Sequence, residues 1–163
     1  MSQYSVEITS MQFLELKVPP PVVGLFTAVI MWLTAKKVPA LELALPQRKG
    51  LVLGVLAAGV CLSVLGVASF RRAGTTVNPL KPERSSHLVT SGIYRYTRNP
   101  MYLGLLLILL GWAVFLANIV AFIFLPAFIA YLNRFQIRPE EKAMASLFGQ
   151  DFANYRSKVR RWL

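Results

Sequence analysis

Long stretches without a charged residue constrain this sequence most. Residues 19–35 and 50–70 contain no Asp, Glu, Lys or Arg, and residues 101–132 form a third such stretch of 32 residues. A helix needs about 20 apolar residues to cross a bilayer core. The first two stretches each fit one span, whereas the third is too long for one span and slightly short for two. The sequence therefore predicts an all-α integral membrane protein with about four transmembrane helices.

The third stretch, residues 101–132, is expected to fold back on itself as a tight helical hairpin. Asn118 is its polar break, so we place the turn near Ala117–Asn118 and expect Pro126 to kink the returning helix. Small residues let membrane helices approach closely. Five glycines are candidates for such contacts: Gly54, Gly59, Gly66, Gly104 and Gly111.

The charged residues are few and mostly basic. They make up 15% of the chain, against about 25% in a typical soluble domain, and the 18 Lys and Arg outnumber the 7 Asp and Glu, for a net charge of +11. A disordered chain is excluded by the 55% hydrophobic content, and a disulfide scaffold by the single Cys61. A soluble nucleic-acid binder would explain the charge but not the apolar stretches, so no nucleic-acid partner is expected.

The placement of the basic residues predicts the orientation in the membrane. Thirteen of the 18 lie in residues 71–100 and 133–163, which should therefore face the cytoplasm together with both termini. The four basic residues from Lys36 to Lys49 would then lie outside, which is an exception to this rule. The first 18 residues lack the compact apolar core of a cleavable signal peptide.

We interpret residues 1–163 as a single membrane domain. Residues 19–35 and 50–70 are its first two transmembrane helices, and residues 101–132 are the transmembrane hairpin. Residues 71–100 form a cytosolic loop, and residues 133–163 form a cytosolic segment that carries an acid pair and an amphipathic helix. The two cytosolic segments lie on the same face of the membrane and can meet there.

The cytosolic loop is expected to be functional rather than a passive connection. Its prolines and glycines exclude a long helix, and a structureless loop beyond about 12–15 residues is usually functional or disordered. Its leucine, isoleucine and tyrosine side chains argue against disorder. An aromatic belt at the membrane surface would explain Tyr96 but leaves the run Arg98-Asn99-Pro100-Met101-Tyr102 unexplained.

An adjacent pair of acids, Glu140 and Glu141, follows Pro139 where a membrane helix reaches the cytoplasm. A helix dipole favours acids in a first turn by about 0.3–1 kcal/mol, which is a sufficient structural explanation. We favour a functional interpretation, because two of only seven acids in a basic surround suit a cationic ligand such as an ammonium or a sulfonium.

A second helix is predicted after these acids. Phe148–Gly149 is typical of a helix end and Asp151 of a new start. Apolar residues then recur at spacings of three and four and predict a basic amphipathic helix on the inner leaflet. These residues are Phe152, Tyr155, Val159 and Trp162.

Several other kinds of site are excluded by what the sequence lacks. His87 is the only histidine, and no second histidine or thiolate completes a metal set, so no metal site is predicted. There is no nucleophile elbow, P-loop or Gly-x-Gly-x-x-Gly stretch. A soluble Rossmann-type methyltransferase or dehydrogenase is therefore excluded.

Taken together, the motifs from residue 71 onward resemble the isoprenylcysteine carboxyl methyltransferase family, as a short, bacterial-type member. The resemblance is carried by Ser91–Arg95, by Arg98–Tyr102 before a membrane hairpin, and by Glu140–Glu141 followed by Phe148-Gly149, Phe152 and Tyr155. Phospholipid N-methyltransferases share this signature, and sterol reductases share it more distantly.

The resemblance implies an S-adenosylmethionine-dependent methyltransferase of the EC 2.1.1 type that methylates a lipophilic acceptor at the cytosolic face. Residues 71–100 would then be the cofactor loop, and Arg98 and Glu141 the catalytic residues. Arg134 or Arg138 would bind the substrate. The implied cofactor-binding residues are His87, Leu88, Val89, Gly92, Tyr94, Arg98, Asn99, Pro100, Tyr102, Glu140 and Glu141.

One position departs from the family pattern. Asn99 stands where the family's Arg-His-Pro motif has histidine, and asparagine cannot act as a base near pH 7. Proton transfer by a histidine at this position is therefore excluded, and it is not needed if the acceptor is already anionic.

The acceptor stays open at this point: a prenylated cysteine carboxylate, a phospholipid amine, an isoprenoid acid, or a small hydrophobic thiol or phenol. The alternatives to this enzyme are a phospholipid N-methyltransferase, a sterol-reductase-like enzyme using a nicotinamide cofactor, and a membrane scaffold that binds anionic lipids without catalysis. The expected location is a bacterial inner membrane, with membrane lipids and a small lipophilic or lipidated substrate as partners.

Overall fold

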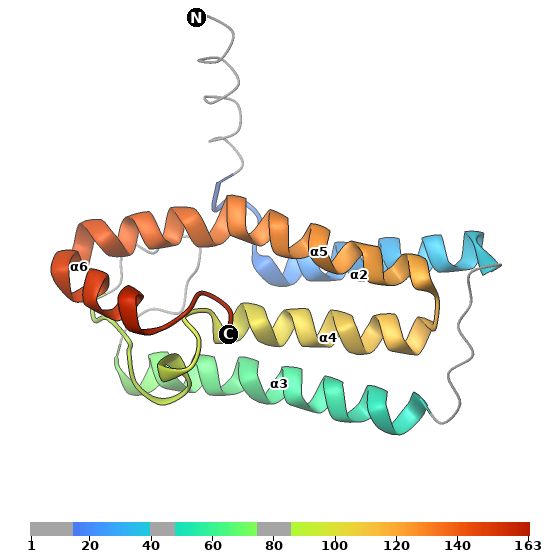
Figure 1. The fold of residues 1–163 in the computed structure, drawn as a ribbon, viewed down its shortest axis with the longest axis horizontal. Coiled ribbons are helices and arrows are strands. Elements are labelled where there is room, and N and C mark those ends of the chain that lie inside the picture. The colour runs from blue at the N-terminus through green and yellow to red at the C-terminus, as the bar shows by residue number, and fades with distance from the viewer. Residues whose placement is uncertain (1–14, 40–47, 75–85) are drawn as a thin grey trace, which may run out of the picture.

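A computed structural model describes residues 15–39, 48–74 and 86–163, and these are helical without a strand. In chain order, α2 (Pro20–Lys37), α3 (Arg48–Arg72), α4 (Pro100–Leu116) and α5 (Ile119–Leu132) lie side by side (Figure 1). A short 3-10 helix, Gly92–Arg95, precedes α4. After α5 the chain continues through a π-helical segment, Asn133–Ile137, into α6 (Arg138–Lys158). The predicted all-α class is confirmed.

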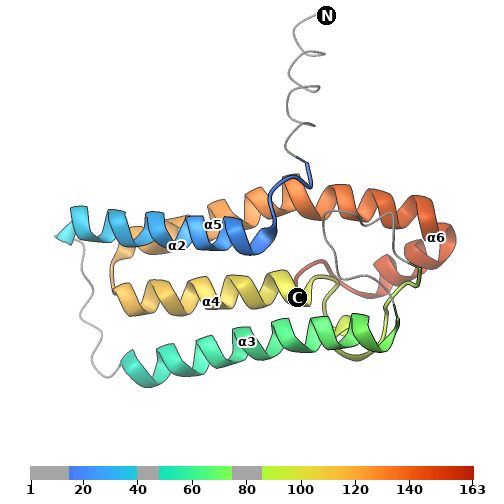
Figure 2. The ribbon, with the colours of Figure 1, turned by 180° about the vertical axis from the view of Figure 1, so that it is seen from behind.

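Helix α4 is the centre of the bundle. It contacts α2, α3 and α5, and α2 also packs on α5. Seen from either side, α3 lies on one side of α4, while α2 and α5 lie on the other (Figures 1 and 2). Most of the buried core side chains accordingly come from α4 and α5, including Tyr102, Leu109, Phe128 and Leu132.

Two helices are long and apolar enough to cross a membrane: α3, and the continuous helix Ile119–Lys158, whose apolar part is α5. Helix α4 is apolar but has only 17 residues. The described residues therefore support the membrane class, whereas a count of four spans stays a prediction. Helix α6 is the polar continuation beyond the apolar stretch and carries both Glu140 and Glu141.

The contact between α3 and α4 depends on glycine. A Cβ atom added to Gly104 would lie 2.6 Å from the Gly59 carbonyl oxygen and closer still to the Ser63 hydroxyl. A Cβ atom on Gly59 would lie 2.7 Å from the Gly104 carbonyl oxygen, so the two backbones touch directly, as expected for membrane helices. Gly66 and Gly111 also face close neighbours, whereas nothing lies within 4 Å of Gly54. The prediction for Gly54 was wrong, because that residue faces away from the bundle.

The hairpin between α4 and α5 turns where the sequence predicts. Ala117 adopts the left-handed conformation (φ 48°, ψ 41°) and ends α4. The Asn118 side chain then accepts a hydrogen bond of 3.0 Å from the Val120 amide and so caps α5. Its Nδ2 donates to the Val38 carbonyl at 2.8 Å, which ties the end of α2 to the same turn.

The predicted amphipathic helix is only partly correct. A break occurs at Gly149, which has a non-helical backbone (φ 48°), as the sequence predicts. The helix then ends at Lys158, and Val159 is extended, so Val159 and Trp162 do not share a helical face with Phe152. Instead the tail 159–163 turns back over the start of α4, and the Trp162 indole donates to Asn133 Oδ1 at 3.2 Å. The apolar period does not continue as a helix, because hydrogen bonds from Thr97, Arg98 and Asn99, directly before α4, hold the tail.

The glycine contact generates a first prediction. We expect Gly104→Ala to lower the free energy of unfolding by about 1–3 kcal/mol, because the new methyl group must push α3 and α4 apart. Thermal unfolding in detergent measures the change. Gly54→Ala is the matched control and should leave the melting temperature unchanged or slightly raised. Equal melting temperatures for both variants would contradict the close contact.

Candidate functional site

The turn before α4 holds the C-terminal tail through hydrogen bonds. The Arg98 amide donates to the Arg160 carbonyl oxygen at 3.0 Å. The Thr97 hydroxyl and Asn99 Nδ2 both donate to the Arg161 carbonyl oxygen, at 3.2 Å and 2.9 Å. Thr97 is buried. Three consecutive residues thus bind the tail, and Pro100 begins α4 directly after them, at a position where a missing amide hydrogen costs nothing.

The guanidinium of Arg98 joins three parts of the chain. Nη1 donates to the carbonyl oxygens of Arg156 and Val159, at 3.0 Å and 2.8 Å. Nη2 donates to Glu141 Oε1 at 2.6 Å, and the exposed fractions of these two side chains are only 9% and 14%. Nε is buried and has no hydrogen-bond partner within the described ranges. Arg98 therefore fixes both ends of α6 to the start of α4, while its buried Nε has no partner among the described residues.

Both carboxylate oxygens of Glu141 are paired with arginine. Arg161 donates from Nη2 to Oε2 at 2.6 Å and from Nε to Oε1 at 3.1 Å, in addition to the Arg98 contact. Burial alone would raise the pKa of Glu141, but the hydrogen bonds from Arg161 and Arg98 hold that pKa below its usual value. Glu141 is therefore ionised at neutral pH, and it links the tail to the start of α6.

The neighbouring acid, Glu140, is in a different environment. The Tyr102 hydroxyl donates to Glu140 Oε1, and this is the only hydrogen bond of the Glu140 side chain to a described residue. Burial raises the pKa of Glu140 to about 8, and the charge of Glu141 acts in the same direction, although the Tyr102 hydrogen bond opposes them. Two adjacent acids thus differ, since Glu141 stays ionised while Glu140 gains or loses a proton near neutral pH.

Tyr94 interacts with both halves of α6, through the charge of Glu140 and through a hydrogen bond from Tyr155. Its backbone carbonyl accepts a hydrogen bond of 2.7 Å from the Tyr155 hydroxyl, and its ring meets the edge of Phe70, with centroids 5.3 Å apart. The pKa of Tyr94 is raised by burial and further by Tyr155 and Glu140, so the phenol stays neutral. The 3-10 helix that carries Tyr94 starts at Gly92, whose φ of 62° suits glycine.

A polar cavity of about 570 Å³ lies between the loop and the second half of α6. This volume is within the range of about 300–1,000 Å³ that small-molecule sites occupy. Cations and an anion line it together with apolar and neutral polar groups: Leu88, Thr90, Arg95, Asp151, Asn154, Tyr155, Lys158 and Val159. Tyr155 thus lines the cavity and also binds Tyr94.

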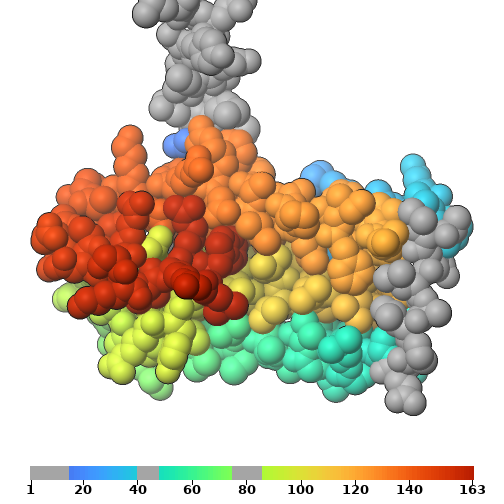
Figure 3. All heavy atoms as spheres, in the orientation of Figure 1, coloured from blue at the N-terminus to red at the C-terminus, as the bar shows by residue number. Residues whose placement is uncertain are grey.

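The structure brings together most of the site residues expected from the sequence. Tyr94, Arg98, Asn99, Pro100, Tyr102, Glu140 and Glu141 meet where α4, α6 and the tail join (Figure 3 shows the tail lying over this junction). Leu88 lines the polar cavity and Val89 is buried, whereas His87 is exposed and hydrogen-bonded to Ser86.

The two predicted substrate-binding arginines are not part of this hydrogen-bond network, and their role in substrate binding stays a prediction. Arg134 forms an ion pair with Glu15 (2.6 Å) and lies over the Phe135 ring, and Arg138 is exposed on α6. The same region holds the N-terminal segment, because the Leu16 amide donates to the Phe135 carbonyl at 3.0 Å. Arg134 therefore anchors residues 15–18 to the π-helical segment.

Sequence reasoning missed three residues that build the site: Thr97, Tyr155 as a partner of Tyr94, and Arg161. Arg161 was counted among the basic residues that orient the protein, and nothing in its spacing of 20 residues from Glu141 indicates a pair. Gln136 was also missed, although a polar residue at the end of an apolar run is a usable signal. It is fully buried, and its Nε2 donates to the Val18 carbonyl at 2.7 Å.

Comparison with known proteins identifies a family. The family model described as phospholipid methyltransferase matches residues 49–151. Protein-S-isoprenylcysteine O-methyltransferase of Schizosaccharomyces pombe is 30% identical over 107 residues, 66% of this chain and 45% of that protein. A probable protein-S-isoprenylcysteine O-methyltransferase of Oryza sativa is 33% identical over 113 residues, 68% of this chain and 56% of that protein. The chain therefore spans about half the length of these two relatives.

A further relative is shorter than this chain. An uncharacterised protein of Haemophilus influenzae is 49% identical over 63 residues, which is 39% of this chain and the whole of that protein. The matched region of the family model includes the turn before α4 and both Glu140 and Glu141.

The arginine network generates a second prediction. We expect Arg98→Lys to release the tail, because lysine cannot replace the three hydrogen bonds that the two Nη atoms donate. Hydrogen bonds to charged groups contribute about 1.5–3 kcal/mol, so tail opening should become about tenfold more frequent or more. Limited trypsin digestion, followed by mass spectrometry, measures cleavage after Lys158 and Arg161.

Arg160→Lys is the matched control for this experiment. The Arg160 side chain is exposed and only its carbonyl oxygen is bound, so the substitution keeps the trypsin sites and should leave the cleavage rate unchanged. If Arg98→Lys is cleaved no faster than Arg160→Lys, the tail is not held by Arg98.

Proposed function

The chain belongs to the phospholipid methyltransferase family, and on this premise we propose that it is an S-adenosylmethionine-dependent methyltransferase acting on a lipophilic acceptor at the cytosolic end of its helices. The observation that carries the proposal is Glu140. This acid lies beside two tyrosines, Tyr94 and Tyr102, while its neighbour Glu141 is fully used by two arginines. Both acids were expected to bind the cofactor. In this proposal Glu141 anchors the tail and Glu140 binds the ligand.

The chemistry around Glu140 fits a cation. A carboxyl group with a single described partner can accept further hydrogen bonds, and tyrosine rings attract cations through their faces. S-adenosylmethionine carries two such groups, a sulfonium and an ammonium. Glu140, Tyr94 and Tyr102 are therefore the residues that would hold its positive end.

The unused donor of Arg98 fits an anion. Its Nε is buried without a partner, although the other two nitrogens of the guanidinium are occupied. A buried, unpaired donor on a charged group is costly, so a ligand carboxylate at this nitrogen would be favourable. A cation-binding acid next to Glu141 in the sequence and an anion-binding arginine paired with Glu141 suit the amino-acid portion of the cofactor.

The remaining residues of the network would position these groups. Glu141 and Arg161 hold the Arg98 guanidinium in place, and Asn99 holds the tail. The polar cavity beyond Tyr155 has room for a nucleoside, and Leu88 and Thr90 would line it. This arrangement supports the expectation that the loop 71–100 binds the cofactor, as far as residues 86–100 are concerned, whereas residues 75–85 of that loop lie outside the described residues.

When bound, S-adenosylmethionine would supply a methyl group to an aligned acceptor, and its sulfur would leave with the bonding electrons as a neutral thioether. The residues of this chain orient the reactants: Glu140 and Arg98 fix the two ends of the amino-acid group, and the apolar helices exclude water. Asn99 has no proton to accept or release near pH 7. An acceptor that is already anionic, such as a carboxylate, needs no base and suits this site best.

The proposed location is the cytoplasmic side of a bacterial inner membrane. Thirteen of the 18 basic residues lie in the segments that build the site, which supports a cytoplasmic orientation by the positive-inside rule. In the same proposal, α2 and α4 cross the membrane together with α3 and α5, so that four spans place both termini inside.

A third prediction tests the activity itself. Purified protein incubated with methyl-radiolabelled S-adenosylmethionine should label a lipophilic carboxylate such as an S-prenylated cysteine, and label phosphatidylethanolamine much less. Label in the phospholipid alone would instead favour N-methylation. Absence of label in either acceptor and in total membrane extracts, with a folded protein, would contradict the proposed function.

A fourth prediction follows from the raised pKa of Glu140, which is about 8. Below this pH, Glu140 carries a proton that a cation must displace, so cofactor affinity should fall as pH falls, approaching a slope of about tenfold per pH unit. Calorimetric titration of S-adenosylmethionine between pH 6 and pH 9 measures the slope and the proton released.

Glu140→Gln should weaken binding and remove the proton release assigned to this residue. Glu15→Gln is the control, because Glu15 is paired with Arg134 away from Glu140, and it should retain the wild-type slope. A slope that is the same in Glu140→Gln as in the wild type would show that Glu140 does not face the cation.

A further inference from the structure

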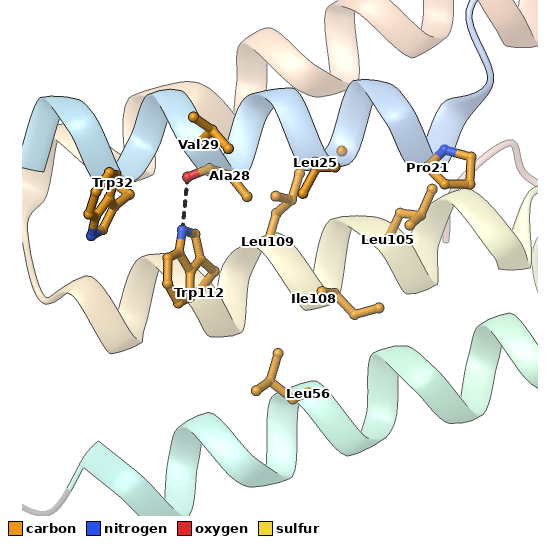
Figure 4. Close-up of a pocket in the computed structure, with 11 residues that line it drawn as sticks. Pro21, Leu25, Ala28, Val29, Trp32, Leu56, Leu105, Ile108, Leu109 and Trp112 are labelled. Carbon is orange, nitrogen blue, oxygen red and sulfur yellow. Dashed lines mark hydrogen bonds between the residues drawn. The ribbon is translucent and has the colours of Figure 1, made fainter.

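An apolar groove lies along α4, between α2 and α3. It has a volume of about 540 Å³, and its lining contains no charged side chain. Gly24 and Trp32 line it from α2, Leu56 from α3, and Leu105, Leu109 and Trp112 from α4. Figure 4 shows the labelled lining residues on three helices, with Trp32 on α2, Leu56 on α3 and Trp112 on α4. Both α2 and α3 pack on α4, and the groove is the space that they leave along it.

The groove starts next to the proposed active site. Leu105, Leu109 and Trp112 follow Tyr102 at intervals of three, seven and ten residues, which places all four on one face of α4. Tyr102 is the residue whose hydroxyl binds Glu140. At 1.5 Å per residue, the path from Tyr102 to Trp112 is about 15 Å long.

Two tryptophans close the far end of the groove. Trp32 and Trp112 lie at one end of the row of lining residues, and Pro21 and Leu105 lie at the other (Figure 4). The Trp112 indole is held by a hydrogen bond of 3.0 Å from Nε1 to the Ala28 carbonyl and is stacked on Phe115. Trp32 is covered by the Lys36 ammonium, 4.1 Å from its ring. Both indoles thus have contacts that hold them at this end of the groove.

The dimensions of the groove decide which occupant fits. The lining residues of α2 extend from Pro21 to Trp32, or about 16.5 Å, so a volume of about 540 Å³ gives a mean cross-section of about 33 Å². A helix with its side chains is about 10 Å across, or about 80 Å² in section, so a helix of a second copy is too wide. A single hydrocarbon chain is narrow enough.

We propose that this groove binds the hydrocarbon tail of the methyl acceptor and that Trp32 and Trp112 limit the length of that tail. This inference rests on the proposed function, because Leu105, the first residue of α4 in the lining, lies about one helical turn from Tyr102, beside which that function places the reacting group. A tail of about 15 Å, or about a dozen carbons, fills the groove from Tyr102 to the indoles. A longer tail meets Trp112 and must leave the groove sideways.

Quenching of tryptophan fluorescence by brominated fatty acids tests the groove directly. Trp162→Phe removes the third tryptophan, so that the signal comes from Trp32 and Trp112 alone. In detergent, 12-bromododecanoic acid should quench this variant saturably, several times more than 2-bromododecanoic acid, and unlabelled dodecanoic acid should reverse the effect. Equal quenching by the two isomers, or quenching that does not saturate, would overturn the proposal.

Two matched glycine variants then locate the binding site. A Cβ atom at Gly24 lies 3.9 Å from Leu105, so Gly24→Leu should fold and fill the groove, and weaken dodecanoate binding at least fivefold. Gly54→Leu adds the same side chain where nothing lies within 4 Å, and it should leave binding unchanged. Equal effects of the two variants would overturn the proposal.

The length limit has its own test. Relative to dodecanoic acid, hexadecanoic acid should displace 12-bromododecanoic acid several times less well, and Trp112→Ala should reduce this difference, with Trp32 reporting the quenching. An unchanged preference in Trp112→Ala and in a Trp32→Ala counterpart would refute the role of the indoles. These measurements need neither cofactor nor turnover, so a failure of the proposed function cannot be mistaken for a failure of the groove.

Discussion

The ion-pair network of Arg98, Glu141 and Arg161 is the interaction on which the site depends. It joins the start of α4, both ends of α6 and the tail, and both Arg98 and Glu141 are largely withdrawn from water. A buried charge without its partner is strongly destabilising, so each member requires the other two. Because the network uses both oxygens of Glu141, it leaves Glu140 as the acid that is available to a ligand.

Much of the fold could be predicted from the sequence, because the membrane class is encoded in local features. The apolar runs and the single polar break at Asn118 are sufficient to locate α3 and the turn between α4 and α5. It is harder to predict from the sequence which face of each helix packs against a neighbour. Four of the five glycines lie in close contacts, but Gly54 does not, since the number of small residues on a helix does not reveal which of its faces meets a neighbour.

The site was predictable in its members but less so in its pairings. The motif around Arg98 and the acids Glu140 and Glu141 indicate which residues meet. They do not indicate that Arg161 pairs with Glu141, because that contact depends on how the tail returns after Lys158. The predicted continuation of the helix through Val159 failed for the same reason: Arg98 and Asn99 hold the carbonyl groups of the tail in an extended segment, which overrides the local apolar period.

The rotational setting of α4 about its own axis positions both the polar site and the apolar groove. Tyr102, Leu105, Leu109 and Trp112 share one face, whereas Gly104 lies about half a turn away from Tyr102 and touches α3. Direct backbone contact at Gly104 permits little rotation of α4, since either direction would bring a larger residue into that contact. The small residues of α3 and α4 therefore fix the direction in which Tyr102 presents its hydroxyl to Glu140. The same contact aligns the groove with that hydroxyl, so that helix packing alone can place a bound tail and its reacting group in register.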